Sequence, residues 1–303
     1  MKILSFGEII WDIYHENRVI GGAPMNFCAH TVMCGAEGYM ISAVGTDELG
    51  RQAFEALKRL NINSEFITES SKATGQCLVS LNANGVPQYN VLNDVSYDYM
   101  NCSDSQLTKI NEKKFDAFYF GTLAQRNQTS RKTLIKILES CFFSQIFCDL
   151  NLRPDCYDEQ SVINCLSHAT VLKCSEEEMP LLKCFEVWKK IEGNDVNETV
   201  NNLFDQYSQL DHFLYTCGAD GAIIFERGKS SVAVPAKKTR VVSTVGAGDS
   251  FGAVWLYLYM LGKTPDEAAK IASLVSAYVV SVNEPVPMYK IDELVKSEYK
   301  KGK

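Results

Sequence analysis

The segment Gly246-Ala247-Gly248-Asp249 combines a turn of small residues with one carboxylate, and the apolar stretch 253–261 behind it predicts a buried helix. Small side chains let backbone N–H groups approach an anion closely, at a helix start whose dipole favours negative charge. An ionised aspartate only accepts, so Asp249 is suited to take the proton of a hydroxyl that attacks a phosphoryl group. The alternative is an ordinary acidic residue at a helix start.

Polar residues near the N-terminus could hold a second ligand. Gly21-Gly22-Ala23-Pro24 places a proline in a first helical turn, with Asn26 directly behind it. Asn26 offers a donor and an acceptor to a polyhydroxy ligand, and Asp12, at the end of a predicted strand, can accept from two neighbouring hydroxyls. A helix-start asparagine and a solvated aspartate remain the alternatives. The segment 45–50 predicts a strand-to-helix turn with Asp47 as N-cap.

Short apolar runs alternate with helix-length segments along the chain. They predict strands at 2–6, 39–44, 117–120, 145–149, 170–173 and 212–216, and helices at 48–60 and 131–140. This alternation is typical of a doubly wound α/β sheet. The segment 75–91 instead predicts two strands around an Asn84-Gly85 turn, and with 11–19 it would form a small separate sheet. We expect this sheet to act as a lid, with the site beneath it.

Composition limits the possible functions. The 303 residues, 46% of them hydrophobic, suit one large α/β domain over 1–303, with a lid of about 11–20 and 74–98. A formal charge of −7 argues against nucleic acid as a partner. The apolar segments are too short for a signal peptide or a membrane span, so we expect a cytoplasmic protein with no membrane partner. Eleven cysteines without a Cys-x-x-Cys motif indicate reduced thiols.

Six motifs follow one another along the chain. They are Asp12, Gly21-Gly22 with Asn26, Gly45 to Gly50, Asp149-Leu150-Asn151-Leu152-Arg153, Thr216 to Gly221, and Gly246 to Asp249. In this order they resemble the motifs of the ribokinase-like sugar kinases, the PfkB family, from Gly7 to about Tyr278. The sequences of residues 21–26 and 120–126 are similar to those of the fructokinase branch of this family. The resemblance implies a ribokinase-like doubly wound, mostly parallel sheet flanked by helices, with a β-sheet lid.

The resemblance also implies an activity, transfer of the γ-phosphoryl group of ATP, with Mg²⁺, to a primary sugar hydroxyl. Asp249 would be the base, and the amides of Gly246, Ala247 and Gly248 would stabilise the transferring group. The sugar would be bound by Asp12, Gly21, Gly22, Asn26 and Arg153, and covered by Gln88 and Tyr89 of the lid. The nucleotide side would include Ser175, Thr216, Gly218, Gly221 and Ser273.

Three departures from the family pattern concern ions. Ser243 stands where the family usually has an aspartate of a monovalent-cation site, and Asn283-Glu284-Pro285 replaces the Gly-Ala that completes that site. Activation by potassium is therefore in doubt. The Asn-x-x-Glu motif associated with Mg²⁺ reads Ser175 to Glu178, which leaves Glu178 as the residue with an indirect role at the metal. We expect altered ion dependence with catalysis retained.

The leading hypothesis is a fructokinase that produces fructose 6-phosphate. The same chemistry on ribose, 2-keto-3-deoxygluconate or a nucleoside is the nearest alternative, because few pocket residues decide the acceptor. A catalytically weak protein that binds sugar or nucleotide is the alternative from another class, and Asp249 with its glycines argues against it. A structural protein without a ligand fits least, since packing alone does not require these glycine turns.

We expect two copies of the chain to pair through the lid sheet. A small sheet presents exposed edges, and the family that the chain resembles pairs its lids. Sedimentation at micromolar concentration should give the mass of a homodimer. A monomer under these conditions would contradict this prediction.

Overall fold

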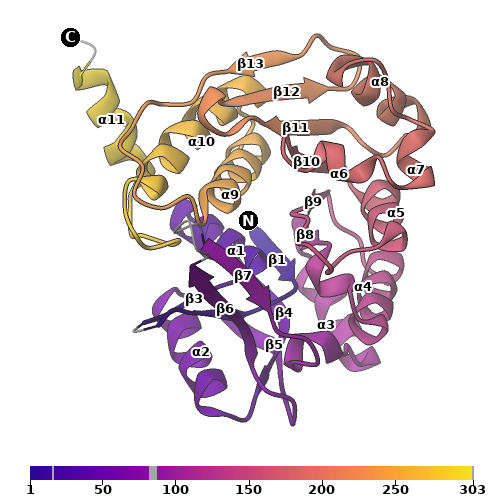
Figure 1. Cartoon of the computed structure of the whole chain (residues 1–303), viewed down its shortest axis with the longest axis vertical. Helices are drawn as coiled ribbons and strands as arrows, with labels where there is room; N and C mark the ends of the chain where they lie inside the picture. The colour runs from indigo at the N-terminus through magenta and orange to yellow at the C-terminus, as the bar shows by residue number, and fades with distance from the viewer. Residues whose placement is uncertain (16, 82–86, 302–303) are drawn as a thin grey trace.

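The predicted strands form the centre of a nine-stranded sheet (Figure 1). The computed structural model describes residues 1–15, 17–81 and 87–301. All six predicted strands occur, and three of them have the predicted bounds. In spatial order the strands are β13 (Val232–Val234), β12 (Ala222–Glu226), β11 (His212–Thr216), β10 (Val171–Ser175), β9 (Gln145–Asp149), β8 (Ala117–Gly121), β1 (Lys2–Phe6), β4 (Glu37–Gly45) and β5 (Asn63–Ser70).

Strand β1 is the point at which the chain switches from adding strands on one side of the sheet to adding them on the other. It pairs in parallel with β4 on one side and with β8 on the other. The chain builds the β4 and β5 side first and then continues from β8 to β11, while β12 and β13 add an antiparallel edge. In a doubly wound sheet, ligands bind beyond the carboxyl ends of the strands at this switch point. The loops that follow β1, β8, β9 and β10 are therefore placed to carry functional residues.

Helices cover both faces of the large sheet (Figure 1). They are α1 (Ala23–Cys34), α2 (Glu48–Arg59), α3 (Asp104–Lys113), α4 (Gln128–Ser140), α5 (Glu159–His168), α6 (Met179–Leu182), α7 (Glu186–Lys189), α8 (Val196–Gln206), α9 (Ala247–Met260), α10 (Pro265–Val280) and α11 (Ile291–Lys301). Ile3 of β1 packs in a core cluster with α9 and α10, whereas Leu4 and Phe6 pack with α4 and α5. This division follows from the alternation of side chains along a strand. Within the described part of the chain, no helix is both long and apolar enough to cross a membrane.

Local signals explain where the helices next to the site begin and end. Helix α1 starts after Gly22 with Pro24 in its first turn, and it ends at Gly35, whose φ of 110° suits glycine. Asp47 caps α2 by accepting from the Gly50 amide, as predicted. Helix α9 begins at Ala247, six residues before the predicted apolar stretch, so the glycine turn lies directly at its N-terminus.

The predicted small sheet is present and lies beside α2 in Figure 1. Its strand order is β3 (Arg18–Gly21), β2 (Ile10–Ile13), β6 (Gly75–Leu81) and β7 (Pro87–Val91). The Asn84-Gly85 turn lies outside the described residues. The predicted lid extended too far toward the C-terminus, because Ser96–Tyr99 forms a short 3-10 helix that contacts β4 instead of joining the sheet. The Trp11 indole N–H donates to the Leu49 carbonyl oxygen of α2 at 3.1 Å and so attaches the sheet to the body.

Candidate functional site

Helices α1 and α9 bring the two predicted halves of the site together at their first turns. The side-chain amide of Asn26 donates a hydrogen bond of 2.8 Å to Asp249 Oδ2, across 223 residues of chain. The other end of the same side chain, Asn26 Oδ1, is buried and has no acceptor or donor partner in the described residues. Because buried polar atoms are nearly always paired, this oxygen is available to a ligand hydroxyl.

The glycine turn is shaped to expose backbone amides. Gly246 has a φ of 82° and is the N-cap of α9, whose 14 residues direct a helix dipole at the turn. Among the described residues, no acceptor is bonded to the amides of Gly246, Gly248 and Asp249, whereas the Ala247 amide donates to the Thr244 carbonyl oxygen at 3.3 Å. Of the three amides predicted to bind an anion, those of Gly246 and Gly248 are therefore free, and Ala247 is already weakly engaged.

A buried ion pair lies directly beneath this turn. Lys173 Nζ donates to both carboxylate oxygens of Asp149 at 2.9 Å. A Cβ atom at Gly248 would lie 3.1 Å from the same nitrogen, so the absence of a side chain at this position makes room for the ammonium group. Burial acts to lower the pKa of Lys173, but the carboxylates of Asp149 and Glu178 outweigh it and raise the pKa. Lys173 is therefore a fixed positive charge behind the anion-binding turn.

Asp249 has the electrostatic properties of a base. Desolvation by the surrounding protein raises the pKa of its carboxyl group, while the hydrogen bond from Asn26 and the charges of Lys173 and Arg153 act in the opposite direction. The raised pKa makes the carboxylate a better proton acceptor than an exposed aspartate. The counteracting contacts favour the ionised form, in which the carboxylate can accept a proton.

A further carboxyl group, that of Glu8, lines the same region. Glu8 follows β1 and is buried, and burial raises its pKa to about 7 against the effect of its own backbone amide, with the charge of Asp249 adding to the increase. A Cβ atom at Gly22 would lie 2.5 Å from the Glu8 carbonyl oxygen, and Gly22 has a φ of 107°. Only glycine suits this conformation and this close approach. Gly21 lies beside the Asn26 side chain, as a Cβ atom there would be 3.8 Å from its amide group.

The lid contributes Asp12 and one of the two residues, Gln88 and Tyr89, that were predicted to cover the sugar. Asp12 is paired with Cys77, and Val79 is paired with Tyr89. Because side chains alternate along a strand, Asp12, Cys77 and Tyr89 share one face of the lid sheet, and Gln88 lies on the other. Desolvation raises the pKa of Asp12 to about 6, although Arg153 and the Cys77 thiol oppose this. The predicted position of Gln88 over the sugar is therefore corrected, because its side chain lies on the face opposite to Asp12. Tyr89 lies on the same face as Asp12, as its predicted role requires.

Arg153 is positioned by the loop that follows β9. Asn151 in this loop has a φ of 40°, a conformation that few residues other than glycine adopt. Glu178 fixes the loop, because its Oε1 accepts from the Leu152 amide at 2.6 Å and its Oε2 accepts from the Ser175 amide at 2.7 Å. Glu178 thus joins the loop after β9 to the end of β10, and the indirect role at a metal predicted for it stays a prediction. Among residues 1–15, 17–81 and 87–301, no cluster of three His, Cys, Asp or Glu side chains is suited to a metal ion.

Most of the predicted nucleotide residues gather at the ends of β10 and β11. Ser175 and Thr216 are paired neighbours across these strands. Gly218 and Gly221 follow in a 3-10 turn, and both have positive φ. Ser273 differs, because it lies on α10 and its hydroxyl donates to the Pro235 carbonyl oxygen at 3.3 Å. Ser273 therefore anchors the segment after β13.

Three features of the site were not predicted from the sequence: Glu8, Lys173 and the role of Asp149 as the partner of Lys173. A charged residue inside an apolar strand was the available signal for Lys173, since a lysine is almost never buried without a partner. Glu8 directly after Gly7 carried a similar signal, as an acidic residue between two apolar runs.

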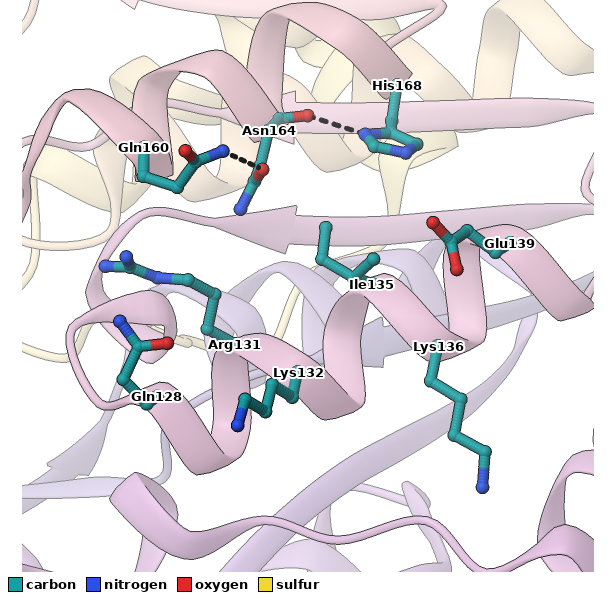
Figure 2. A pocket seen from close by; sticks show the side chains of 9 residues that line it. All are labelled: Gln128, Arg131, Lys132, Ile135, Lys136, Glu139, Gln160, Asn164 and His168. Carbon is teal, nitrogen blue, oxygen red and sulfur yellow. Dashed lines mark hydrogen bonds between the residues drawn. The ribbon is translucent and has the colours of Figure 1, made fainter.

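A groove of about 450 Å³ between α4 and α5 is separate from this site (Figure 2). It is lined by Gln128, Arg131, Lys132, Ile135, Lys136, Glu139, Gln160, Asn164 and His168. Arg131 is paired with Asp158 and Lys136 with Asp104, each at 2.7 Å. Asn164 accepts from Gln160, as the dashed line in Figure 2 shows. None of the predicted site residues lines this groove.

Comparisons with known proteins identify the family of the chain. The profile described as pfkB family carbohydrate kinase matches residues 3–289. The chain is 27% identical over 315 residues to a protein of Pyrococcus horikoshii named as a sugar kinase, covering 97% of this chain and 94% of that protein. It is 25% identical over 281 residues to a protein of Arabidopsis thaliana named fructokinase-5, covering 86% and 83%. It is also 25% identical over 307 residues to a 2-dehydro-3-deoxygluconokinase of Dickeya dadantii, covering 92% and 94%.

Solved structures have the same fold. A fructokinase from Xylella fastidiosa with bound ATP superposes with a TM-score of 0.82 at 18% identity, covering 98% of this chain and 99% of that chain. An Escherichia coli protein named as a ribokinase II, in complex with ATP and Mg²⁺, gives a TM-score of 0.81 at 18% identity, covering 99% of each chain. At these identities the likeness shows the fold.

We predict that Lys173→Met strongly destabilises the protein, because it leaves the Asp149 carboxylate buried without a partner. Breaking a buried pair costs about 3–5 kcal/mol of unfolding free energy, whereas removing both charges costs much less. The double variant Lys173→Met/Asp149→Asn should therefore be more stable than the single one. Urea unfolding of the three proteins measures this. A double variant less stable than Lys173→Met would contradict the charge pair as described.

Proposed function

The chain belongs to the pfkB family of carbohydrate kinases, and from this premise we propose that it transfers the γ-phosphoryl group of ATP to the 6-hydroxyl of fructose, giving fructose 6-phosphate and ADP. Family membership carries the general activity, ATP-dependent phosphorylation of a carbohydrate. The choice of fructose is our proposal. It is supported by the resemblance of residues 21–26 and 120–126 to the fructokinase branch and by the relative named fructokinase-5.

The single observation that carries the proposal is the contact between Asn26 and Asp249. Asn26 belongs to the proposed sugar side and Asp249 is the proposed base, so the contact brings the acceptor hydroxyl within reach of the carboxylate. The free amides of Gly248 and Asp249 at the start of α9 lie at the same point. A hydroxyl, a base and an anion site at one point are what phosphoryl transfer to an alcohol requires.

Each residue has a distinct role in this proposal. Asp249 accepts the proton of the attacking hydroxyl, while its neighbouring amides and the charge of Lys173 stabilise the transferring group. Bound MgATP supplies the phosphoryl group and the metal charge that neutralises it. The described part of the chain has no dedicated metal-binding cluster, which suits Mg²⁺ that is held mainly by phosphates and water. Tyr89, from the lid, excludes water that would otherwise hydrolyse ATP.

The charges around the sugar side favour a neutral acceptor. Glu8, Asp12 and Asp249 are all carboxylates, and a sugar acid would be repelled by whichever of them is ionised.

One observation favours the second candidate, 2-keto-3-deoxygluconate. The Arg153 side chain is exposed, and within the described part of the chain it has no hydrogen bond or ion pair. A guanidinium of this kind can bind a carboxylate in bidentate fashion.

We expect ADP release from MgATP with fructose, and none with ribose, 2-keto-3-deoxygluconate, adenosine or no sugar. A coupled assay across this panel, followed by identification of the phosphorylated position, measures the substrate directly. Turnover with 2-keto-3-deoxygluconate instead would replace the acceptor and assign Arg153 to its carboxylate. Turnover with none of the panel, in a protein that still binds ATP, would favour a weakly catalytic binding protein and contradict the proposal.

Asp249→Asn should retain binding of ATP and fructose and lose about 10²–10⁴-fold in kcat, because the amide keeps the shape of the carboxylate but accepts no proton. Calorimetric titration of both ligands and steady-state kinetics separate binding from turnover. Asp205→Asn, at an exposed position of α8, serves as a matched control outside the predicted site. Near-normal turnover of Asp249→Asn would dismiss this residue as the base.

Two further parts of the proposal concern the setting of the enzyme. We place it in the cytoplasm and as a homodimer paired through the lid. Leu78 and Tyr14 of the lid region are 40% and 37% exposed, so apolar surface is present there for a second copy to cover.

A further inference from the structure

His30 is a fully buried histidine that the catalytic proposal does not use. It lies on α1 one helical turn after Asn26, so both side chains occupy the same face of the helix. Its Nε2 lies 3.0 Å from the Pro285 carbonyl oxygen, and its Nδ1 lies 3.0 Å from the Tyr289 hydroxyl. The imidazole therefore connects α1 to the loop between α10 and α11.

The hydrogen bonds fix the form of the ring. A carbonyl oxygen only accepts, so His30 Nε2 carries the proton and donates to Pro285. The other nitrogen of a neutral imidazole accepts, so the Tyr289 hydroxyl donates to Nδ1. Burial lowers the pKa of His30 to about 4, and the ring is thus neutral near pH 7 with both nitrogens satisfied. The Tyr289 ring also stacks near the imidazole, with centroids 5.7 Å apart.

The loop held by His30 packs directly behind the anion-binding turn. A Cβ atom at Gly246 would clash with the Pro285 carbonyl oxygen and would lie 3.0 Å from the Pro285 Cα. Pro285 is buried. The conformation of Gly246, with its positive φ, therefore depends on the position of the Pro285 peptide. Helix α1 thus reaches both ends of the turn, through Asn26 at Asp249 and through His30 and Pro285 at Gly246.

We propose that His30 is a positioning residue for phosphoryl transfer, which holds the Pro285 carbonyl against Gly246 and so fixes the anion-binding turn without a monovalent cation. The inference rests on the proposed kinase function for its kinetic consequences. Its structural content, a side-chain donor to the Pro285 carbonyl oxygen, is independent of the acceptor sugar.

The residues around this loop do not fit a potassium site. The family pattern implies a carboxylate at the position of Ser243, and the loop that contains Pro285 would complete the site. Here the Ser243 hydroxyl accepts from the Val245 amide at 3.3 Å, and the Pro285 carbonyl oxygen already accepts from His30. A cation needs several oxygens with free lone pairs and benefits from a negative charge. A neutral imidazole N–H in this position satisfies the carbonyl without an ion.

Three substitutions separate the two hydrogen bonds of His30. His30→Gln places an amide N–H near the position of Nε2 and can still donate to Pro285, whereas His30→Asn is too short to do so. Tyr289→Phe removes the donor to Nδ1 and keeps the aromatic ring. We expect near wild-type kinetics for His30→Gln, and for His30→Asn a kcat that falls about tenfold to a hundredfold with a higher KM for ATP. Tyr289→Phe should lie between them.

Kinetics are measured in KCl, in NaCl and in tetramethylammonium chloride at equal ionic strength, with thermal unfolding as the check on folding. The wild-type protein should show the same kcat in all three salts. Several-fold activation by KCl would overturn the proposal, and so would a folded His30→Asn protein with wild-type kcat and KM for ATP. If His30→Asn does not fold, a Tyr289→Phe protein with wild-type kinetics together with KCl activation of the wild type would overturn it.

A crystal of the wild-type protein soaked in RbCl separates this inference from the proposed function. Anomalous scattering should show no rubidium within coordinating distance of the Pro285 carbonyl oxygen or Ser243, whatever sugar the enzyme uses. Rubidium at that carbonyl would refute the inference and leave the fructokinase proposal intact. Turnover with another sugar, together with indifference to KCl, would refute the fructokinase proposal and leave the inference about His30 intact.

Discussion

The arrangement of the site depends on the close approach of two helix starts, α1 and α9, at the centre of the sheet. The hydrogen bond from Asn26 to Asp249 joins them, and glycines beside the two helix starts let neighbouring groups come close. Gly22 meets the backbone of Glu8, Gly246 meets Pro285, and Gly248 meets Lys173. Each glycine thus allows one neighbour to come close, and together they leave backbone amides facing the same point.

The second constraint on the site is the negative charge of the carboxyl groups that surround it. Four carboxyl groups, Glu8, Asp12, Asp149 and Asp249, lie around a site that must also receive the phosphates of ATP. Lys173 offsets the charge of Asp149 beneath the turn, and the charge of Arg153 opposes the rise that burial causes in the pKa values of Asp12 and Asp249. Burial raises the pKa values of Glu8 and Asp12, so the sugar side carries less negative charge at neutral pH than its composition indicates. This balance is consistent with the proposed binding of a neutral sugar beside an anionic nucleotide.

Residues whose function is local could be predicted from the sequence. The glycine turn, the Pro24 helix start and the Asp47 cap are determined by their immediate neighbours, and all three were predicted. The apolar strand around Lys173 indicated that this lysine needs a partner, but the partner could not be predicted, because the pairing of β10 with β9 places Lys173 opposite Asp149. His30 contacts Pro285 across 255 residues, and no local pattern indicates such a contact. Gln88 was misassigned for a related reason, since the face of a strand residue depends on strand register.

The most direct test of the central claim is a crystal structure with a non-hydrolysable ATP analogue and fructose bound together. The account predicts the γ-phosphate on the amides of Gly248 and Asp249, with the 6-hydroxyl of fructose within about 3 Å of the Asp249 carboxylate. It also predicts a sugar hydroxyl on Asn26 Oδ1, a buried oxygen with no partner among the described residues. A γ-phosphate bound away from the start of α9, or a sugar whose primary hydroxyl points away from Asp249, would contradict the account.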